Sequence, residues 1–284
     1  MNARWAMKRA GKWGLEWGMA LSGVALAYRR SRYFTAGHRI LTYHCVRPKA
    51  DSSDTVSTAH FLAHMAYLAD HYPVVDLDEL VKGIAGEKPL ETGSVAVTLD
   101  DGYKESFTYA AEIMQRYKVP ATLFVVTRPL DTGEEVRGRA FLSWDDVRAM
   151  DRAGFAIGSH TVNHPSLSAI PIEEARRELA TSKRRIEEEL RKPPVALSYP
   201  YGTLRDISPR VVEIAREVGY TFAVTAMNGL NHRGADVFWL RRTALSAGDG
   251  LTGFKLIMGG CLDPWLFVDR WAYRLQKGGY AKGF

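Results

Sequence analysis

Cysteine is scarce in this 284-residue sequence, which contains only Cys45 and Cys261. Two cysteines do not form a disulfide scaffold, and they leave the redox compartment of the protein open. The sequence also lacks an internal repeat, a low-complexity tract and a nucleic-acid-binding motif. Its formal net charge of +6 favours anionic partners. Because the basic residues are spread along the chain, a membrane lipid or an acidic glycan fits this charge better than a nucleic acid does.

Strand-like and helix-like segments alternate from about residue 40 onward. With 46% hydrophobic and 25% charged residues, the chain can form one large domain with a buried core, with or without appendages. The alternation predicts an α/β fold with parallel strands and helices outside them. We expect strands at residues 40–44, 73–76, 95–100, 121–126, 155–159, 195–199, 221–225 and 237–243. We expect helices at residues 58–71, 107–117, 171–191 and 208–218, and another that starts at residue 143.

Two carboxylates stand side by side at the end of one predicted strand. The apolar, β-branched run 95–99 is followed by Asp100, Asp101 and Gly102. Adjacent carboxylates repel each other, and burying them is unfavourable unless a cation or a hydrogen-bond donor compensates. On its own this motif is most often a simple turn. A divalent metal would bind one carboxylate and leave the other available as a base.

Two histidines follow another predicted strand. His160 and His164 are four residues apart, but Pro165 disfavours a helical conformation at His164, so we expect a loop here. Two imidazoles and one carboxylate suit zinc, and cobalt, nickel or manganese are alternatives. Three protein ligands leave a coordination position for water or substrate, as in catalytic metal sites. The two motifs together therefore indicate a metal-assisted hydrolase.

A third motif, residues 198–202, follows the apolar stretch 195–197. Its sequence is Ser-Tyr-Pro-Tyr-Gly. The simple interpretation is a strand that ends in a Pro-Gly turn. The functional interpretation is the wall of a groove, with a backbone N–H directed at a developing oxyanion.

The three motifs, in this order, resemble those of polysaccharide deacetylases, the carbohydrate esterases with the NodB-homology domain. The resemblance covers roughly residues 39–245. It implies a distorted, incomplete (β/α) barrel of about seven parallel strands. It also implies that Asp100 is the general base and that the backbone N–H of Tyr201 polarises the substrate carbonyl. The metal ligands that it implies are Asp101, His160 and His164.

The sequence departs from the usual family pattern at two places. The third motif normally begins with Arg but here begins with Ser198, and no histidine follows His232 to act as the family's late general acid. The strand 40–44 ends in His44 and resembles the opening strand of the circularly permuted branch, typified by poly-N-acetylglucosamine deacetylases. In that branch the acid comes from this strand, so we assign it to His44; a structural hydrogen bond is the alternative. Arg241 or Arg242 can replace the missing Arg, and we prefer Arg242.

The resemblance and the chemistry predict a metal-dependent N-deacetylase of an N-acetylated glycan. Acetate and a free amino sugar would be the products. Two alternatives stay open. One is a catalytically inactive glycan-binding or scaffold barrel, and the other is a deacylase that acts on an ester or a non-sugar amide. The sequence identifies neither the glycan nor the oligomeric state.

The N-terminal segment, residues 1–35, is basic and rich in tryptophan. An apolar stretch of about sixteen residues, 13–28, lies between basic residues and is shorter than the ~20 residues that span a bilayer. It can be a signal peptide cleaved near residues 25–27, but the arginines that follow disfavour export. An interfacial helix fits better, with Trp5, Trp13 and Trp17 and positive charge at both ends.

The C-terminal segment, residues 249–284, carries a second such element. Asp263 and Pro264 are typical of a helix start, and an apolar stripe follows beside basic residues. The stripe is Trp265, Leu266, Val268, Trp271, Ala272 and Leu275, and the basic residues are Arg270, Arg274 and Lys277. This helix either packs on the core or lies on a membrane. We therefore expect a deacetylase domain at 36–248 between two membrane-seeking termini, with peripheral membrane association on a side that stays open.

Overall fold

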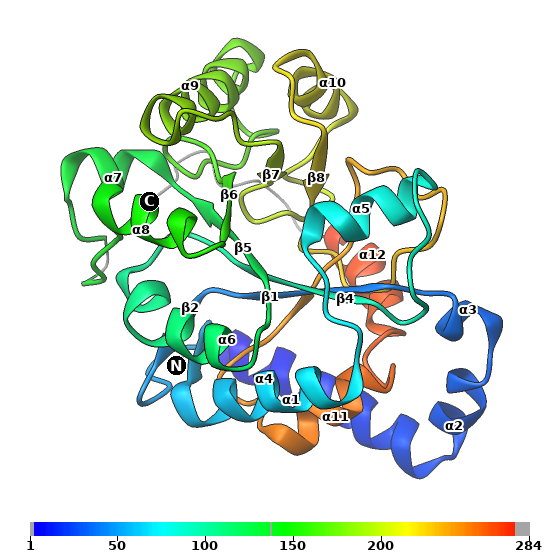
Figure 1. Cartoon of the computed structure of the whole chain (residues 1–284). Helices are drawn as coiled ribbons and strands as arrows, with labels where there is room; N and C mark the ends of the chain where they lie inside the picture. Colours follow the sequence, from blue (N-terminus) through cyan, green and yellow to red (C-terminus); the bar gives the residue numbers. More distant parts are fainter. Residues whose placement is uncertain (1–2, 137, 276–284) are drawn as a thin grey trace.

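A single curled sheet of seven parallel strands forms the centre of the computed structural model, which describes residues 3–136 and 138–275 (Figure 1). The strand order is β8-β7-β6-β5-β4-β1-β9. The strands are β1 (Arg39–Tyr43), β4 (Val95–Leu99), β5 (Ala121–Val125), β6 (Ala156–Ser159), β7 (Ala196–Ser198), β8 (Phe222–Val224) and β9 (Thr243–Ala244). All pairings between them are parallel. The predicted incomplete (β/α) barrel of about seven parallel strands is confirmed.

Helices surround the sheet, as the alternation predicted (Figure 1). Those that connect strands are α4 (Thr58–His71), α5 (Leu77–Ala85), the π-helical turn η1 (Ser106–Ala110), α6 (Ala111–Arg116), α7 (Thr127–Thr132), α8 (Trp144–Arg152), α9 (Ile172–Leu190) and α10 (Pro209–Glu217). Serine side chains accept hydrogen bonds from first-turn amides at the starts of α4, α8 and α10, namely Ser57, Ser143 and Ser208. At the start of α8, Ser143 and Asp146 form a capping box. Two short strands, β2 (Cys45–Arg47) and β3 (Thr55–Ser57), form a separate parallel pair.

The segment 240–244 bridges the open side of the barrel. Leu240 forms a parallel bridge with Val224 of β8, and Thr243 pairs with Leu41 of β1. A chain that crosses from one sheet edge to the other cannot pair along its whole length with either edge. The regular strand predicted at 237–243 is therefore reduced to β9, and the strand predicted at 73–76 is reduced to one bridge between Val74 and Val95.

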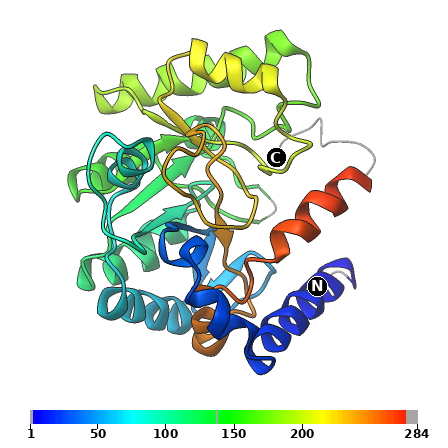
Figure 2. The ribbon, with the colours of Figure 1, turned by 90° about the vertical axis from the view of Figure 1, so that its right-hand side faces the viewer.

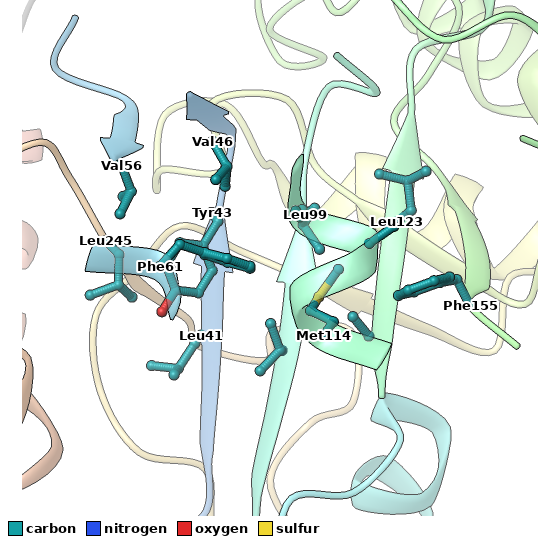
Figure 3. Packing of buried hydrophobic residues seen from close by; sticks show 14 of the residues in the cluster. Leu41, Tyr43, Val46, Val56, Phe61, Leu99, Met114, Leu123, Phe155 and Leu245 are labelled. Atoms are coloured by element: carbon teal, nitrogen blue, oxygen red, sulfur yellow. The ribbon is translucent and has the colours of Figure 1, made fainter. Parts of the chain in front are cut away.

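The largest core cluster lies between one face of the sheet and the helices α4 and α6 (Figure 3). Leu41 and Tyr43 of β1 and Leu99 of β4 are fully buried there. They pack with Phe61 from α4 and Met114 from α6, which are also fully buried. A separate cluster with Ile40 and Ala96 covers the other face of the same strands, and burial on both faces is typical of parallel sheets covered by helices. This rigid sheet holds the polar residues at its edge.

Segments from the two ends of the chain lie side by side against the barrel (Figure 2). The N-terminal segment forms α1 (Ala3–Leu21), α2 (Val24–Arg29) and α3 (Arg32–Thr35), and the C-terminal segment forms α11 (Leu251–Met258) and α12 (Trp265–Leu275). None of the described helices combines the length and the apolar character needed to cross a membrane. Lys277, predicted beside the apolar stripe of α12, lies outside the described residues.

Candidate active site

The candidate active-site residues lie where parallel strands end, at one edge of the sheet. His44 follows β1 and Asp100 follows the adjacent β4, and the Asp100 amide donates a hydrogen bond to the Tyr43 carbonyl at 2.9 Å. His160 follows β6, two strands away. Because carboxyl ends of parallel strands meet at the same edge, residues 116 positions apart in the sequence become neighbours. Asp101 adopts a left-handed conformation with φ 75°, which turns the chain directly after the strand.

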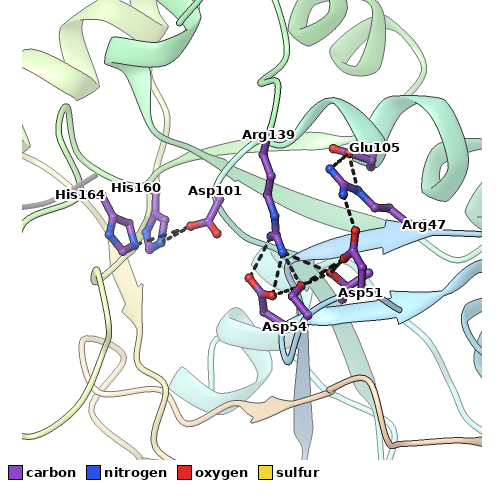
Figure 4. Close-up of polar contacts among 10 residues, drawn as sticks. Arg47, Asp51, Asp54, Asp101, Glu105, Arg139, His160 and His164 are labelled. Carbon is purple, nitrogen blue, oxygen red and sulfur yellow. Dashed lines mark hydrogen bonds and ion pairs between the residues drawn. The ribbon is translucent and has the colours of Figure 1, made fainter. Parts of the chain in front are cut away.

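Asp101, His160 and His164 form one buried cluster (Figure 4). Their ligand atoms lie within 4.8 Å of one another. Asp101 Oδ1 is 3.5 Å from His160 Nε2 and 3.6 Å from His164 Nε2. The structure therefore brings together the three residues that the sequence predicted as metal ligands.

The chemistry of this cluster fits a divalent metal. Asp101 Oδ1 is buried and accepts no hydrogen bond from the described residues, so a cation would satisfy it. His160 Nδ1 lies 2.7 Å from the Ser198 carbonyl oxygen, to which it donates a hydrogen bond. This bond fixes the tautomer and leaves the Nε2 lone pair directed at the cluster, as is usual for metal-binding histidines. One carboxylate and two imidazoles are a zinc-type donor set.

Burial and neighbouring charges set the protonation of the cluster. Burial, together with the charge of His160, lowers the pKa of His164 to about 3, so this imidazole is neutral. Burial acts to lower the pKa of His160 as well, but the two aspartates outweigh it and raise the pKa. Burial acts to raise the pKa of Asp101, but the histidines outweigh it and hold the pKa below its usual range. Asp101 is thus an ionised carboxylate and His164 a neutral imidazole, the forms that metal binding requires, whereas a bound cation would displace the proton that the two aspartates favour on His160.

Arg242 is fully buried and holds Asp100 through a bidentate ion pair. Its two terminal nitrogens donate to Asp100 Oδ1 and Oδ2, each at 2.7 Å. The Arg242 guanidinium also donates hydrogen bonds to Thr42 Oγ1, Thr98 Oγ1, Ser198 Oγ and the Thr225 carbonyl. Burial acts to raise the pKa of Asp100, but the Arg242 charge outweighs it and lowers the pKa. Of the two arginines considered from the sequence, the structure places Arg242 at the site.

Ser198 occupies the position at which the family motif normally carries an arginine. Its hydroxyl accepts a hydrogen bond from Arg242 at 2.9 Å and donates one to Asp100 Oδ2 at 3.2 Å. A serine is small enough to leave room for a guanidinium that arrives from another segment of the chain. Arg242 therefore contacts both Asp100 and the Ser198 hydroxyl.

Tyr201 lies on the wall of the same pocket in a strained backbone conformation. Its φ is 58°, and its ring contacts His164 edge-on with centroids 4.8 Å apart. Gly202 follows with φ 60°, and a Cβ at this position would lie 2.5 Å from the Ala226 backbone nitrogen. Only glycine fits here, so the third motif is held tightly against the sheet.

His44 lines the pocket together with Asp54, which is held by Arg139. Neither Asp54 nor Arg139 was assigned to the site from the sequence. The Nδ1 of His44 is buried and makes no hydrogen bond within the described part of the chain. Arg139 donates to both carboxylate oxygens of Asp54 at 2.9 Å (Figure 4). Burial acts to raise the pKa of Asp54, but Arg139 and the nearby His44 outweigh it and lower the pKa. Asp54 and Arg139 lie in the segments 51–57 and 129–139, outside the three motifs.

The pocket that joins these groups has a volume of about 220 Å³. It is lined by Thr42, His44, Asp54, Asp100, Asp101, Tyr103, His160, His164, Tyr199, Tyr201, Ala226, Arg242 and Ala244. All seven residues predicted for the site from the sequence line this one pocket. In (β/α) barrels, active sites lie at the carboxyl ends of the strands, and this pocket lies there.

The comparisons with known proteins point to one family with this fold. Residues 87–223 match the polysaccharide deacetylase family model. This segment contains all three motifs and is thus similar to polysaccharide deacetylases, as the motifs predicted.

Individual relatives agree with this assignment. The chain is 26% identical to YxkH of Bacillus subtilis, over 74% of this chain and 71% of that protein. It is also 26% identical to the poly-beta-1,6-N-acetyl-D-glucosamine N-deacetylase of Escherichia coli K12, over 68% of this chain but only 34% of that protein. Thus it spans about a third of the length of the latter relative.

Solved structures show the same fold. The Streptococcus pyogenes deacetylase PplD superposes with a TM-score of 0.70 at 22% identity, over 78% of this chain and 98% of that chain. IcaB from Ammonifex degensii superposes with a TM-score of 0.69 at 21% identity, over 80% and 97%. The predicted resemblance to the poly-N-acetylglucosamine deacetylase branch is confirmed.

Proposed function

We propose that this protein is a metal-dependent hydrolase that removes N-acetyl groups from an N-acetylated glycan. One observation carries the proposal, namely the buried Asp101–His160–His164 cluster beside an Arg242-held Asp100 in a single pocket. Residues 36–248 would form the catalytic part of the chain. Asp101, His160 and His164 would hold the metal, for which zinc is the preferred ion and cobalt, nickel or manganese are alternatives. When bound, such an ion would act as a Lewis acid and lower the pKa of a water molecule.

Asp100 is the proposed general base. Its low pKa keeps it ionised at neutral pH, so it can accept the proton of the attacking water. The two hydrogen bonds from Arg242 fix the plane of the carboxylate, while Asp100 still lines the pocket. The backbone N–H of Tyr201 is the proposed donor to the oxyanion that forms on the acetyl carbonyl.

His44 is the proposed general acid. It lines the same pocket as the Asp101–His160–His164 cluster, and an imidazole can give up a proton near neutral pH to a leaving amine. The Asp54 carboxylate lines the same pocket as His44. Arg139 in turn holds Asp54 in place.

Acetate release tests the proposal directly. The zinc-reconstituted full chain is expected to release acetate and an equal amount of free amine from β-1,6-linked N-acetylglucosamine oligomers, and chelation of the metal is expected to abolish both. Asp145→Asn is a matched control, because Asp145 is 90% exposed on α8. This variant should keep full activity.

Three results would contradict the proposal. Release of acetate from O-acetylated glycans alone would favour an esterase. Binding of the oligomers without any turnover would favour an inactive barrel. Turnover that persists after complete removal of the metal would exclude the proposed metal dependence.

A further inference from the structure

The outer side of the two terminal helices is unusually apolar for a protein surface. Trp13, Trp17 and Leu21 of α1 and Phe267 and Trp271 of α12 are exposed, Trp17 by 48% and Trp271 by 69%. Trp13, Trp17 and Leu21 recur at every fourth position and so share one face of α1, and the same spacing relates Phe267 to Trp271. We call these five residues the terminal face. Exposed aromatic clusters of this kind mark interaction sites.

The two helices form one layer, although they come from opposite ends of the chain. Figure 2 shows α1 and α12 side by side on the same side of the molecule. Trp265 at the start of α12 packs on Gly11 of α1, and Lys12 lies over its ring at 6.0 Å. The inner sides of the helices are buried, at Glu16 on α1 and at Leu266 on α12. Trp13 and Trp17 border a groove between α1 and residues 248–253, but their side chains stay 42% and 48% exposed, so solvent reaches the terminal face.

Polar contacts between the terminal segments hold this layer in place. Tyr28 donates a hydrogen bond to Asp263 Oδ2 at 3.0 Å, and Arg29 Nε donates one to the Gly259 carbonyl at 2.9 Å. Asp263 also pairs with the buried Arg39 of β1 at 2.9 Å. The terminal face is thus a fixed part of the folded protein.

Exposed charge around the terminal face is of one sign. Within residues 9–36 and 263–271, the acidic side chains are Glu16, Asp263 and Asp269, and all three are buried. Burial raises the pKa of Glu16 to about 7, which further reduces its negative charge. The basic side chains of the same ranges are all at least partly exposed, namely Arg9, Lys12, Arg29, Arg30, Arg32 and Arg270.

We propose that the terminal face docks the protein onto the anionic surface of a lipid bilayer. Tryptophan and phenylalanine side chains would enter the headgroup region while the arginines contact lipid phosphates. The charge distribution favours this partner over a second copy of the chain, because two copies would bring their positive charges together. The exposed apolar side chains favour a bilayer over an acidic glycan, since a glycan offers no apolar phase to Leu21 and Phe267.

Vesicle co-sedimentation of the full chain tests this proposal. Wild type is expected to bind vesicles with about a third phosphatidylglycerol at least tenfold more tightly than neutral phosphatidylcholine vesicles at about 0.15 M salt. Its tryptophan emission should shift to the blue on binding. Trp17→Ser/Trp271→Ser should weaken binding about tenfold or more. Arg30→Glu/Arg270→Glu should weaken it at least about twentyfold, since each basic residue near an anionic surface is worth roughly a fivefold change.

Matched control variants lie on α9 and in the segment just after it, at the opposite side of the barrel (Figure 1). Ile172 and Val195, at the two ends of this helix region, are exposed apolar residues, and Arg177 and Arg184 are exposed basic residues. Ile172→Ser/Val195→Ser and Arg177→Glu/Arg184→Glu should bind vesicles as wild type does. Every variant must first keep the wild-type circular dichroism spectrum and melting temperature.

Several results would overturn the proposal. One is a folded wild type that does not bind anionic vesicles, and another is a control pair that loses as much binding as the test pair. Sedimentation of the lipid-free protein as a dimer that Trp17→Ser/Trp271→Ser dissociates would assign the face to a second copy. None of these results depends on deacetylase activity, so the two proposals can fail independently.

Discussion

Asp100→Asn is expected to lower the rate of acetate release at least about a thousandfold, because an amide cannot accept the proton of the attacking water. The substitution keeps the size of the side chain, and Ser198 and Arg242 can still contact its oxygen. Acetate release at saturating N-acetylglucosamine oligomer measures the effect. The loss should appear in kcat, with little change in KM.

Two controls distinguish the loss of the general base in Asp100→Asn from general damage to the structure of the site. The Asp100→Asn protein must keep the far-UV circular dichroism spectrum of wild type at the assay temperature. Asp145→Asn, the same change at an exposed carboxylate, should leave the rate unaltered. An Asp100→Asn protein with more than about a tenth of wild-type turnover would remove Asp100 from the role of base.

Arg242→Met is expected to lower the free energy of unfolding by about 3–5 kcal/mol at pH 7, because it leaves the Asp100 carboxylate buried without its partner. For a domain of this size that corresponds to a fall in melting temperature of roughly 10 °C. Turnover should fall as well, since Asp100 loses the two hydrogen bonds that orient it. Thermal unfolding followed by circular dichroism measures the first effect.

The pH dependence of this loss follows from the pKa of Asp100. In wild type the folded pKa lies below the unfolded value, so the Asp100 pair stabilises the protein above the unfolded pKa of about 4 and stops doing so as the pH falls through the folded pKa. In Arg242→Met, burial is expected to raise the folded pKa above the unfolded value. The stability difference between the two proteins should therefore be large at pH 7 and shrink toward pH 4.5.

Arg241→Met is the matched control for this prediction. It makes the same change one residue earlier, where the side chain is half-buried and outside the pocket lining. Its melting temperature should stay within about 2 °C of wild type, in line with small effects of partly exposed charges. If Arg241→Met lost as much stability as Arg242→Met, or if the Arg242→Met loss did not depend on pH, the buried pair would not be the cause.

Most of the fold could be predicted from the sequence, because its strands are apolar runs flanked by turn residues. Residues 95–99 and 121–125 are apolar runs flanked by turn residues, and both are strands of the sheet. The end of the barrel was harder to predict. Residues 237–243 resemble a strand in composition, but their position between β8 and β1 allows pairing only at Leu240 and from Thr243 onward. This restriction on pairing arises from the closure of the sheet, so the local sequence of residues 237–243 does not reveal it.

Motif residues of the site were visible in the sequence, but their supporting partners were not. Thr42 and Thr98 carry hydroxyls within mostly apolar strands, and the two residues are paired in register across β1 and β4. Both accept hydrogen bonds from Arg242 in the barrel interior. Polar residues that pair in register on two neighbouring buried strands therefore indicate a buried polar partner, here the Arg242 guanidinium. By contrast, the Arg139–Asp54 pair joins two loops 85 residues apart, and only the folded chain brings them together.

Metal content of the purified protein tests the central claim most directly, because it requires no assumption about the substrate. After reconstitution with zinc and removal of unbound ion, elemental analysis should find about one metal per wild-type chain. Asp100→Asn should keep the metal, since Asp100 is proposed as the base. Asp101→Ala should lose it, because Asp101 supplies the carboxylate of the cluster. Absence of bound metal in reconstituted wild type, or equal metal in wild type and Asp101→Ala, would contradict the proposed metal-dependent deacetylase.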